Sequence, residues 1–522
     1  MSPLTLILGF PFLGALAVAF VPKHLRAVVR WIALVATFLS MAVALLVFGM
    51  FDSKILEPQF EQQFHWVPAL GISYHVGVDG LNVGLVLMGA IVAFAAACVS
   101  WEIREREKEF YVLLLIMTGG ILGAFASLDL FFFYAFHELA LIPTFIMIGL
   151  WGKGENRSYA TYNITIYLSL GALIALVGLI VLYLQAGAKT FDMIELRQQI
   201  SSVPLSAAAQ RLIFPFLLFG FGILVSLWPF HTWAPLGYGS APTATAMLHA
   251  GVLKKFGLYG LLRIAVPLLP GAAHDWLGVI TFLCLGNIVY CGFVAMRQKD
   301  LNLLIGNSSV AHMGFAFLGI ASLSLAGITG AVLVMIAHGL LAALTFALSG
   351  YLFQQTKTLN VDELGGLLRK MPFIGGALVM AMLAGCGLPG FANFVGEVMV
   401  FFGSWDRWPL PTALAVWGAL VIGGVYMLRA IRAILHGPTP ERWNGVRDAE
   451  NPFRRLPYAL LLVSLLIFGF FPKLLTEKIA PAAARIASMA NARVAEQPVS
   501  SPMVALNAPE TSTPANRIST HE

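Results

Sequence analysis

The sequence has little charge for its length. Only 11% of its 522 residues are Asp, Glu, Lys or Arg, whereas 59% are hydrophobic, and the mean hydropathy is +0.82. No soluble domain of this size has such a composition, so it excludes a soluble enzyme and predicts a polytopic helical membrane protein. The formal net charge of +6 does not indicate nucleic-acid binding, because the basic residues lie in short loops between apolar runs.

Cysteine is also scarce, and the sequence does not predict a signal peptide. The four cysteines lie inside apolar runs without the spacing of metal ligands, so we interpret them as buried thiols: Cys98, Cys284, Cys291 and Cys386. The first apolar run, Leu4 to Val21, is followed rather than preceded by basic residues and has no convincing cleavage site. We interpret it as a retained first helix and not as a signal peptide.

Apolar runs long enough to cross about 30 Å of hydrocarbon recur along the chain. We expect fourteen transmembrane helices, over the approximate ranges 3–21, 29–50, 79–100, 111–127, 130–151, 160–186, 210–230, 241–266, 275–296, 301–322, 326–353, 373–403, 411–435 and 456–475. Between the sixth and the seventh, Phe191 to Ile200 is predicted to form a short amphipathic surface segment. From about Ala480 large apolar residues become rare, so residues 1–478 are the predicted transmembrane domain and 479–522 a disordered extracytoplasmic tail.

Lysine and arginine are distributed unevenly among the loops. Most of them follow odd-numbered helices. Because cytoplasmic loops carry the excess of Lys and Arg, this asymmetry predicts that both termini lie outside the cytoplasm. One missed helix would destroy the asymmetry, so it also supports the count of fourteen.

One stretch combines helix breakers, histidines and two adjacent lysines within apolar sequence: WPFHTWAP (228–235), SAPTA (240–244) and HAGVLKKFG (249–257). An ammonium at the middle of a bilayer costs roughly 3 kcal/mol on insertion scales, so we expect at least one of Lys254 and Lys255 to have a function. A buried lysine can load and release a proton near neutral pH, which an arginine cannot. The alternative is that one lysine only extends to the membrane interface.

Few other ionisable side chains lie in the apolar runs. They are His137 and Glu138 in the fifth, His231 and His249 beside the central stretch, His312 in the tenth, His338 in the eleventh and Glu397 in the twelfth. A lone histidine can be explained by an interhelical hydrogen bond, but a carboxylate at this depth is harder to explain structurally. The combination of two acids, at least one lysine and two histidines on successive helices predicts a path for protons across the hydrocarbon.

Two of the predicted helices contain breakers at membrane depth. Pro229 and Pro235 interrupt the seventh helix and its exit, and Leu388-Pro389-Gly390 interrupts the twelfth. Interrupted helices are tolerated mainly where they line a hydrated cavity. Two interruptions five helices apart predict two inverted five-helix repeats, helices 4–8 and 9–13. The predicted fold class is therefore an all-α polytopic membrane protein with broken helices 7 and 12.

Six motifs resemble the antiporter-like subunits of bacterial NADH–quinone oxidoreductase (respiratory complex I). They are GISYHVGVDGL (71–81), HELALIP (137–143), PFHTW (229–233), APTA (241–244), SSVAHMG (308–314) and NFVGE (393–397). The resemblance covers roughly residues 60–475. The HVGVDGL stretch favours the subunit M branch, the counterpart of mitochondrial chain 4, over a larger relative that has a long lateral helix.

This resemblance implies a proton-translocating subunit, driven by quinone reduction elsewhere in the complex. It implies no cofactor site in this chain, since FMN, the iron–sulfur clusters and the quinone belong to partner subunits. It assigns proton transfer to Glu138, Lys255, His312, His338 and Glu397, with Lys254, His231 and His137 as further candidates. It also implies a bacterial cytoplasmic (inner) membrane, with neighbouring antiporter-like subunits and membrane lipid as partners and no nucleic acid.

The chain departs from the family pattern near the central stretch. Leu224 stands where the family has a helix 7 lysine that pairs with the helix 5 glutamate, here Glu138. The sequence LGYGS (236–240) replaces acidic and histidine residues, and DLNLL (300–304) replaces DLKRL. We hypothesise that Lys254 becomes the partner of Glu138 while Lys255 carries the proton. The alternatives are that His137 or His231 is the partner, or that nothing is.

Two other functions remain compatible with the sequence. The equivalent subunit of a sodium/proton antiporter, or of a membrane-bound hydrogenase or carbon-uptake complex, would share these helices and buried residues. A structural subunit that has lost pumping would account for Leu224, although Glu138, Lys255 and Glu397 argue against it.

Overall fold

The structure is a computed structural model that describes residues 2–495. Twelve helical segments in this range are long and apolar enough to cross a membrane. They are α1 (Pro3–Phe20), α2 (Arg26–Met50), α3 (Val83–Val99), α4 (Glu107–Ala126), α5 (Leu130–Trp151), α6 (Arg157–Gln185), α8 (Ala207–Val225), α13 (Pro270–Leu285) with α14 (Cys291–Arg297), α15 (Leu301–Ser322), α16 (Leu325–Thr356), α20 (Pro409–Trp417) with α21 (Gly424–Leu435), and α22 (Pro452–Phe470).

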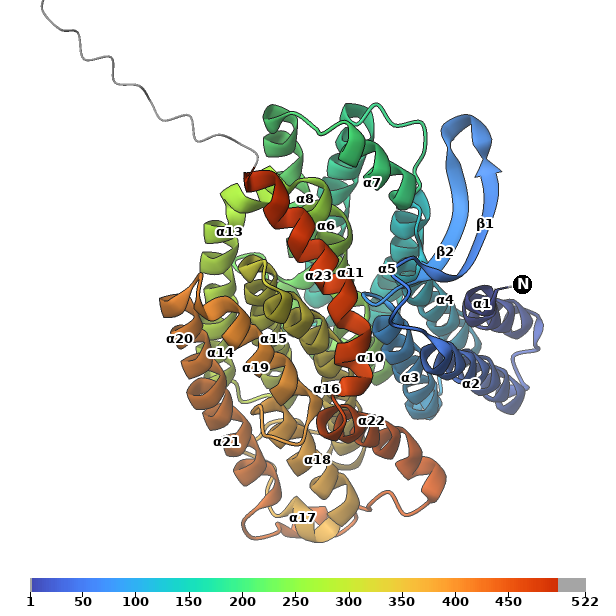
Figure 1. The fold of residues 1–522 in the computed structure, drawn as a ribbon. Coiled ribbons are helices and arrows are strands. Elements are labelled where there is room, and N and C mark those ends of the chain that lie inside the picture. The colour runs from blue at the N-terminus through green and yellow to red at the C-terminus, as the bar shows by residue number, and fades with distance from the viewer. Residues whose placement is uncertain (1, 496–522) are drawn as a thin grey trace, which may run out of the picture.

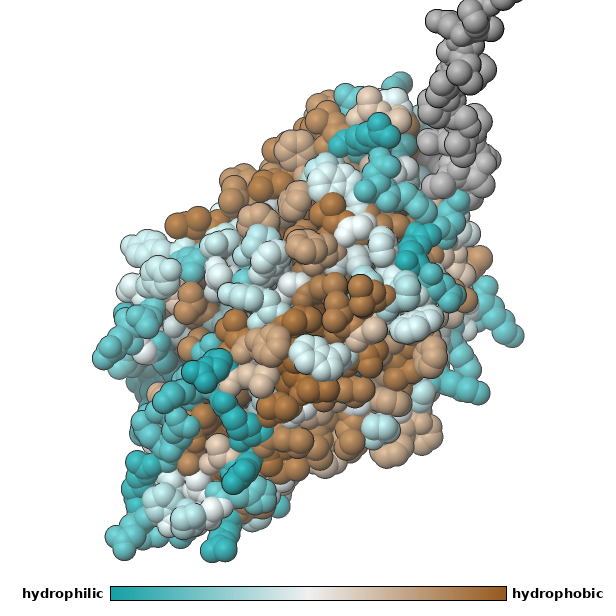
Figure 2. All heavy atoms as spheres, turned by 90° about the vertical axis from the view of Figure 1, so that its left-hand side faces the viewer, coloured by the Kyte–Doolittle hydropathy of each residue, from teal (hydrophilic) through white to brown (hydrophobic). Residues whose placement is uncertain are grey.

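The two remaining expected spans are built from shorter helices. The eighth consists of α10 (Thr243–Gly251), α11 (Phe256–Gly260) and α12 (Val266–Leu268), and the twelfth of α18 (Pro372–Gly385) and α19 (Ala392–Trp405). With α9 (Trp233–Ser240) as the second half of the seventh, the predicted fourteen segments are confirmed. Figure 2 shows a band of hydrophobic side chains between two hydrophilic zones, as a membrane-spanning bundle requires.

Helix α16 lies at the centre of the bundle. It packs against α3, α10, α15 and α19, and the whole of its most apolar stretch is buried, as is nearly all of that in α3 and α15. These helices are apolar on all sides, which is expected of helices that other helices surround. Titratable side chains on α15 and α16 are therefore enclosed by protein and not by lipid.

Both predicted interruptions are present. Helix α8 ends at Val225, where Ser226 adopts a left-handed conformation (φ 67°), and helix α18 ends at Gly385, before Gly387 (φ 67°) and Gly390 (φ 102°). They occupy the fourth segment of each predicted repeat.

A third interruption was not predicted. The expected helix 241–266 stops at Gly251, and a 3-10 turn, Leu253–Lys255, carries both lysines before α11 begins. Close packing accompanies this break: a Cβ on Gly251 would lie 2.9 Å from the carbonyl oxygen of Gly339, and one on Gly257 would lie 2.2 Å from that of Phe221. The sequence carries no proline here, so the break had no obvious signal.

The fold is mostly helical, as predicted, and it has one further element that was not predicted. Strands β1 (Gln59–Val67) and β2 (Ile72–Val78) form an antiparallel hairpin between α2 and α3. Both are rich in aromatic and β-branched residues, and Gly71 (φ 69°) allows the tight turn between them. The hairpin lies at the same end of the bundle as the predicted surface helix α7 (Met193–Ser202), and helix α17 (Leu367–Lys370) lies at the opposite end (Figure 1).

The predicted disordered tail is wrong for its first part. Residues 473–495 form helix α23 (Lys473–Ala495), which packs against α13 and α16 and buries Leu475, Ile479, Ala483 and Ala490. The scarcity of large apolar residues suggested disorder, but the alanines of this segment favour a helix, and its buried side chains recur at helical spacing. The rest of the predicted tail, 496–522, lies outside the described residues. The four cysteines are free thiols; Cys284 and Cys291 are buried, and Cys98 and Cys386 are partly buried.

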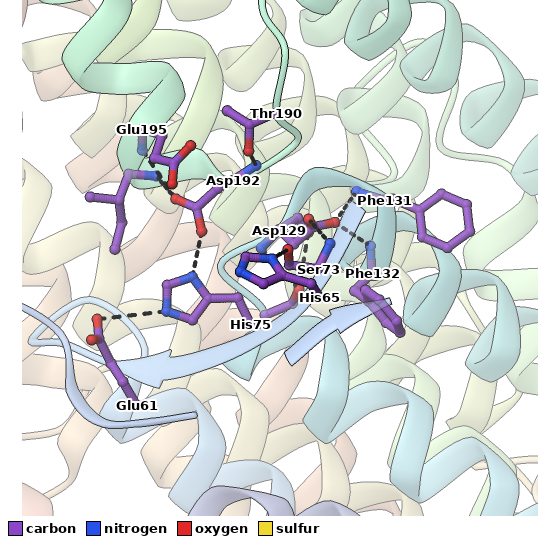
Figure 3. Close-up of polar contacts among 12 residues, drawn as sticks. Glu61, His65, Ser73, His75, Asp129, Phe131, Phe132, Thr190, Asp192 and Glu195 are labelled. Carbon is purple, nitrogen blue, oxygen red and sulfur yellow. Dashed lines mark hydrogen bonds and ion pairs between the residues drawn. The ribbon is translucent and has the colours of Figure 1, made fainter. Parts of the chain in front are cut away.

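Four acidic and histidine side chains, which we call the hairpin latch, connect the hairpin to α5 and α7 (Figure 3). His75 of β2 forms a hydrogen bond with Asp192, the N-cap of α7, and lies 3.8 Å from Glu61 of β1. Asp129, the N-cap of α5, accepts a hydrogen bond from the Ser73 backbone N–H at 3.0 Å. The latch therefore joins three segments that are distant in the sequence.

The latch shifts the pKa values of its members. Burial alone would lower the pKa of His75, but the hydrogen bond and charge of Asp192 outweigh it and raise that pKa. Burial would raise the pKa of Asp192, but its bonds from His75 and from backbone N–H groups lower it. Burial raises the pKa of Asp129 to about 6 despite its backbone hydrogen bonds. The ion pair of His75 and Asp192 is the stabilising interaction of the cluster.

The latch should be most stable in mildly acidic solution. A raised histidine pKa gives stability that is complete below the ordinary value of 6.5 and is lost as the pH rises through the raised value. Asp129 acts with the same sign, with loss as the pH rises through about 6. Asp192 acts with the opposite sign, so its contribution is complete above 3.8 and is lost only at lower pH.

We therefore predict that backbone amides of residues 59–78 exchange with deuterium several-fold more slowly at pH 5.5 than at pH 8.5, after correction for the intrinsic exchange rate. Hydrogen-exchange mass spectrometry measures this, and His75→Gln, which keeps a hydrogen-bond donor but does not titrate, is the matched variant. Equal protection of the wild-type hairpin at both values would contradict the role of the ion pair.

Candidate functional site

Lys255 begins a line of buried titratable side chains. It lies on the 3-10 turn, is fully buried, and its ammonium donates a hydrogen bond to the Ala250 carbonyl oxygen. Its Nζ lies 3.3 Å from Nδ1 of His338, which α16 carries and which is also buried. The lysine and this histidine are therefore direct neighbours.

His312 continues the line on α15. The rings of His338 and His312 meet edge to face, with centroids 5.2 Å apart. His312 Nδ1 lies 2.7 Å from the Ser308 carbonyl oxygen, and its Nε2 lies 3.2 Å from the Gly385 carbonyl oxygen. Because only an imidazolium can donate from both nitrogens, these two acceptors stabilise the protonated form of His312.

Glu397 ends the line on α19. Its Oε1 lies 3.9 Å from His312 Nε2, and the residue is 4% exposed. A Cβ on Gly387 would lie 2.5 Å from Glu397 Oε2, so the carboxylate fits against the interruption of the twelfth segment. A cavity with room for roughly one water molecule adjoins His312, Glu397 and Tyr426. We call Lys255, His338, His312 and Glu397 the central polar axis.

Lys254 contacts side chains that are not members of the central polar axis. Its Nζ donates a hydrogen bond to Ser309 Oγ on α15 at 3.2 Å and lies 5.7 Å from the centre of the Tyr238 ring on α9. Neither contact is with Glu138, so the hypothesis that Lys254 partners Glu138 through water stays a prediction. The sequence could not predict these contacts, because the directions of both lysine side chains depend on a 3-10 turn that was not predicted.

Glu138 is not enclosed as we expected. Its side chain is 31% exposed, on the same face of α5 as the exposed Ile142 and Ile146. Among the side chains described, its ion-pair partner is His137, whose Nδ1 lies 3.5 Å from Glu138 Oε1, and neither of these two atoms has a hydrogen-bond partner. Leu224 is buried on α8. One of the alternatives, a partnership of His137 with Glu138, is therefore the arrangement found.

His249 is a buried residue that we did not select as a site residue. Its Nδ1 lies 3.1 Å from the Tyr238 hydroxyl, its Nε2 has no hydrogen-bond partner among the described residues, and His137 is near enough to act on it electrostatically. Tyr238 connects it to Lys254. The sequence feature that could have identified His249 as a site residue is its position in HAGVLKK (249–255), the stretch that also carries both lysines.

His231 and His137 are placed differently. The His137 ring stacks on Phe256, directly after Lys255, at 4.0 Å between centroids. His231 lies in the interruption of the seventh segment, with Nδ1 3.2 Å from the Pro229 carbonyl oxygen, and its ring packs against Tyr290. The structure thus places His137 between Glu138 and the lysine turn, whereas His231 has no contact with the central polar axis.

A cavity of about 320 Å³ opens near the start of α10. Its polar lining is contributed by α10, α15, α16 and nearby loops: Lys153, Thr243, Asp300, Asn302, Ser349, Lys357, Thr358 and Asn360. Ala246 also lines it, one helical turn before His249. The segments that depart from the family pattern, LGYGS and DLNLL, contribute Gly239, Asp300 and Asn302 to it. We call this cavity the vestibule.

Residues 127–423 match the NADH:quinone oxidoreductase/Mrp antiporter transmembrane family. The chain belongs to this family. It is 33% identical to NAD(P)H-quinone oxidoreductase chain 4 of Gloeobacter violaceus, over 94% of each chain. It is 32% identical to NADH-quinone oxidoreductase subunit M of Rickettsia conorii, over 85% of this chain and 89% of that protein.

Solved structures agree with this assignment. A chain of respiratory complex I from Thermus thermophilus superposes with a TM-score of 0.85 at 28% identity, over 94% of this chain and 99% of that chain. A chain of the Mrp complex from Dietzia superposes with a TM-score of 0.79 at 19% identity, over 93% and 97%, which shows the shared fold alone. The resemblance drawn from the motifs is confirmed: the chain is an antiporter-like membrane subunit of the complex I type.

Proposed function

We propose that the chain is the proton-translocating M-type subunit of a bacterial NADH–quinone oxidoreductase, and that the central polar axis carries the protons. The observation that supports this is the continuity of the axis. Four buried titratable side chains from four separate segments follow one another from Lys255 to Glu397, without a contact to lipid. A purely structural subunit has no need of such an arrangement, because each buried charge costs stability.

Each proton transfer along the axis has a donor and an acceptor in place. The Lys255 ammonium passes its proton to His338 Nδ1, which leaves a neutral amine and an imidazolium. His338 then protonates His312, whose two carbonyl neighbours stabilise the product. His312 passes a proton to the Glu397 carboxylate, directly after a small movement or through one water in the adjoining cavity.

The vestibule supplies the other end of this path. Lys153 and Lys357, which line it, belong to loops on the side where lysine and arginine are in excess, so we assign the vestibule to the cytoplasmic side and both termini to the other side of the bacterial inner membrane. From Ala246 the path continues to His249, whose Nδ1 is hydrogen-bonded to the Tyr238 hydroxyl, and Tyr238 contacts Lys254. His249 is the residue through which Lys254 and Lys255 would be reloaded.

Glu138 connects the path to a neighbouring subunit. Its carboxylate lies on an exposed apolar face of α5, where a partner would enclose it, and its in-chain neighbour His137 stacks on Phe256. Redox chemistry in other subunits would change the charge near Glu138 and, through His137, the charge at the lysine turn. The flavin, iron–sulfur clusters and quinone remain in those partners under this proposal.

The second candidate function is that of an Mrp-type antiporter subunit, since the family includes both groups. The identity of 32–34% to proteins named chain 4 or subunit M favours the oxidoreductase. Transport of sodium by membranes that contain the chain, without dependence on NADH, would favour the antiporter instead.

The two lysines should differ in effect. Lys255→Ala removes the group that donates to His338, so we expect NADH-driven proton pumping to fall at least about tenfold with assembly retained. Lys254→Ala removes the hydrogen bond to Ser309 and the contact with Tyr238 but leaves the donor to His338 in place, so it should lower pumping by only a few-fold. Quenching of a ΔpH-sensitive dye in inside-out vesicles measures both. Equal losses in the two variants, or none in Lys255→Ala, would count against the assignment.

His249 should limit proton loading. His249→Leu keeps a buried side chain of similar size but cannot hold a proton, so we predict a several-fold loss of pumping that deepens as the cytoplasmic pH rises and protons become scarce. His231→Leu is the matched control. His231 lies in the interruption of the seventh segment and does not contact the central polar axis, so this variant should pump normally. A loss in His249→Leu that is the same at pH 6 and pH 8 would indicate a structural role instead.

A further inference from the structure

A small cleft lies at the hairpin end of the bundle, where α23 crosses the ends of α3 and the eighth segment (Figure 1). Five charged side chains line it: Asp79, Arg197, Arg263, Lys478 and Arg485. Its volume is about 40 Å³, which is room for about three water molecules or one phosphate group. We call this the cationic cleft.

The one acid among these five is already engaged. Arg263 donates to both carboxylate oxygens of Asp79, with Nη2 2.8 Å from Oδ1 and a second bond from Nη1 to Oδ2. Both side chains are largely buried. This bidentate pair neutralises one arginine and leaves Asp79 little capacity to balance the other cations.

The other three cations lack a strong partner. Arg197 of α7 has no hydrogen bond or ion pair with any described residue, although it is partly buried. Lys478 donates to the Phe51 carbonyl oxygen at 3.1 Å and lies over the rings of Phe48 and Phe51. Arg485 lies 3.9 Å from Glu57, whose side chain is 68% exposed, so water screens that pair.

The crowding of positive charge at the cleft is unfavourable without an anion. Burial, followed by the charges of Arg485 and Arg263, lowers the pKa of Arg197. These cations come from three different segments, namely α7, the eighth segment and α23, so their meeting is a property of the tertiary fold and not of one basic stretch. An anion in the cleft would turn this mutual repulsion into attraction.

We propose that the cationic cleft binds a phosphate group, carried by an anionic lipid headgroup or by free phosphate. Guanidinium groups match the geometry of phosphate oxygens, and an ammonium adds a further donor. The remaining wall of the cleft is apolar and includes Leu56, Leu262, Ile486 and Met489, which would suit the glycerol and first acyl carbons of a lipid. The bound phosphate would hold α23 against α7 and α3, independently of the proton path.

Hydrogen-exchange mass spectrometry of the purified, delipidated complex in maltoside detergent tests this proposal. We expect phosphatidylglycerol to slow exchange in residues 473–491 several-fold. Diacylglycerol, which has the same acyl chains but no phosphate, should have no effect. Protection by 10 mM inorganic phosphate as well would assign the site to free phosphate, whereas protection by phosphatidylglycerol alone would assign it to the lipid headgroup.

Variants connect the effect to the cleft. Arg197→Gln and Arg485→Gln should each lose most of the protection, whereas Arg211→Gln, which removes an exposed arginine paired with Asp275, should respond as the wild type does. If one of the two cleft variants does not assemble, the hydrogen-exchange response of the other variant tests the proposal. The proposal is overturned if neither phosphatidylglycerol nor phosphate protects the wild type, or if the cleft variants respond like Arg211→Gln.

Discussion

The contact between the Lys255 ammonium and the His338 ring is the interaction on which the interior of this protein depends. A lysine that is fully buried beneath transmembrane helices needs a neighbour that can accept its charge or its proton. His338 can do so because α16 is enclosed by other helices and lies beside the turn that carries the lysine. The same requirement applies to the other two members of the central polar axis, His312 and Glu397, which are also buried.

The interrupted helices also supply hydrogen-bond partners for these buried groups. The last turn of α10 provides the Ala250 carbonyl oxygen for Lys255, and the end of α18 provides the Gly385 carbonyl oxygen for His312. Carbonyls in the last turn of a helix have no partner within that helix, so a break at depth supplies acceptors for cations where water is scarce. Two of the three interruptions thus lie beside members of the central polar axis, where their carbonyl oxygens stabilise the protonated forms.

Much of this fold could be predicted from the sequence, because apolar runs determine membrane segments and proline or glycine determines two of the breaks. The hairpin and α23 could not, since both are surface elements whose stability comes from contacts such as His75 with Asp192 and from the buried alanines of α23. The candidate site was predicted as a set of residues but not as a geometry. Which lysine meets the histidines depends on the 3-10 turn at Leu253–Lys255, and the exposure of Glu138 depends on which face of α5 the other helices cover.

The most direct test of the central claim is the rate of proton uptake per NADH oxidised in proteoliposomes that contain the oxidoreductase with His338→Leu. His338 lies between Lys255 and His312, and leucine fills its buried volume without accepting a proton. The account predicts an assembled complex in which proton uptake coupled to NADH oxidation falls at least about tenfold. Normal proton uptake in this variant would contradict it.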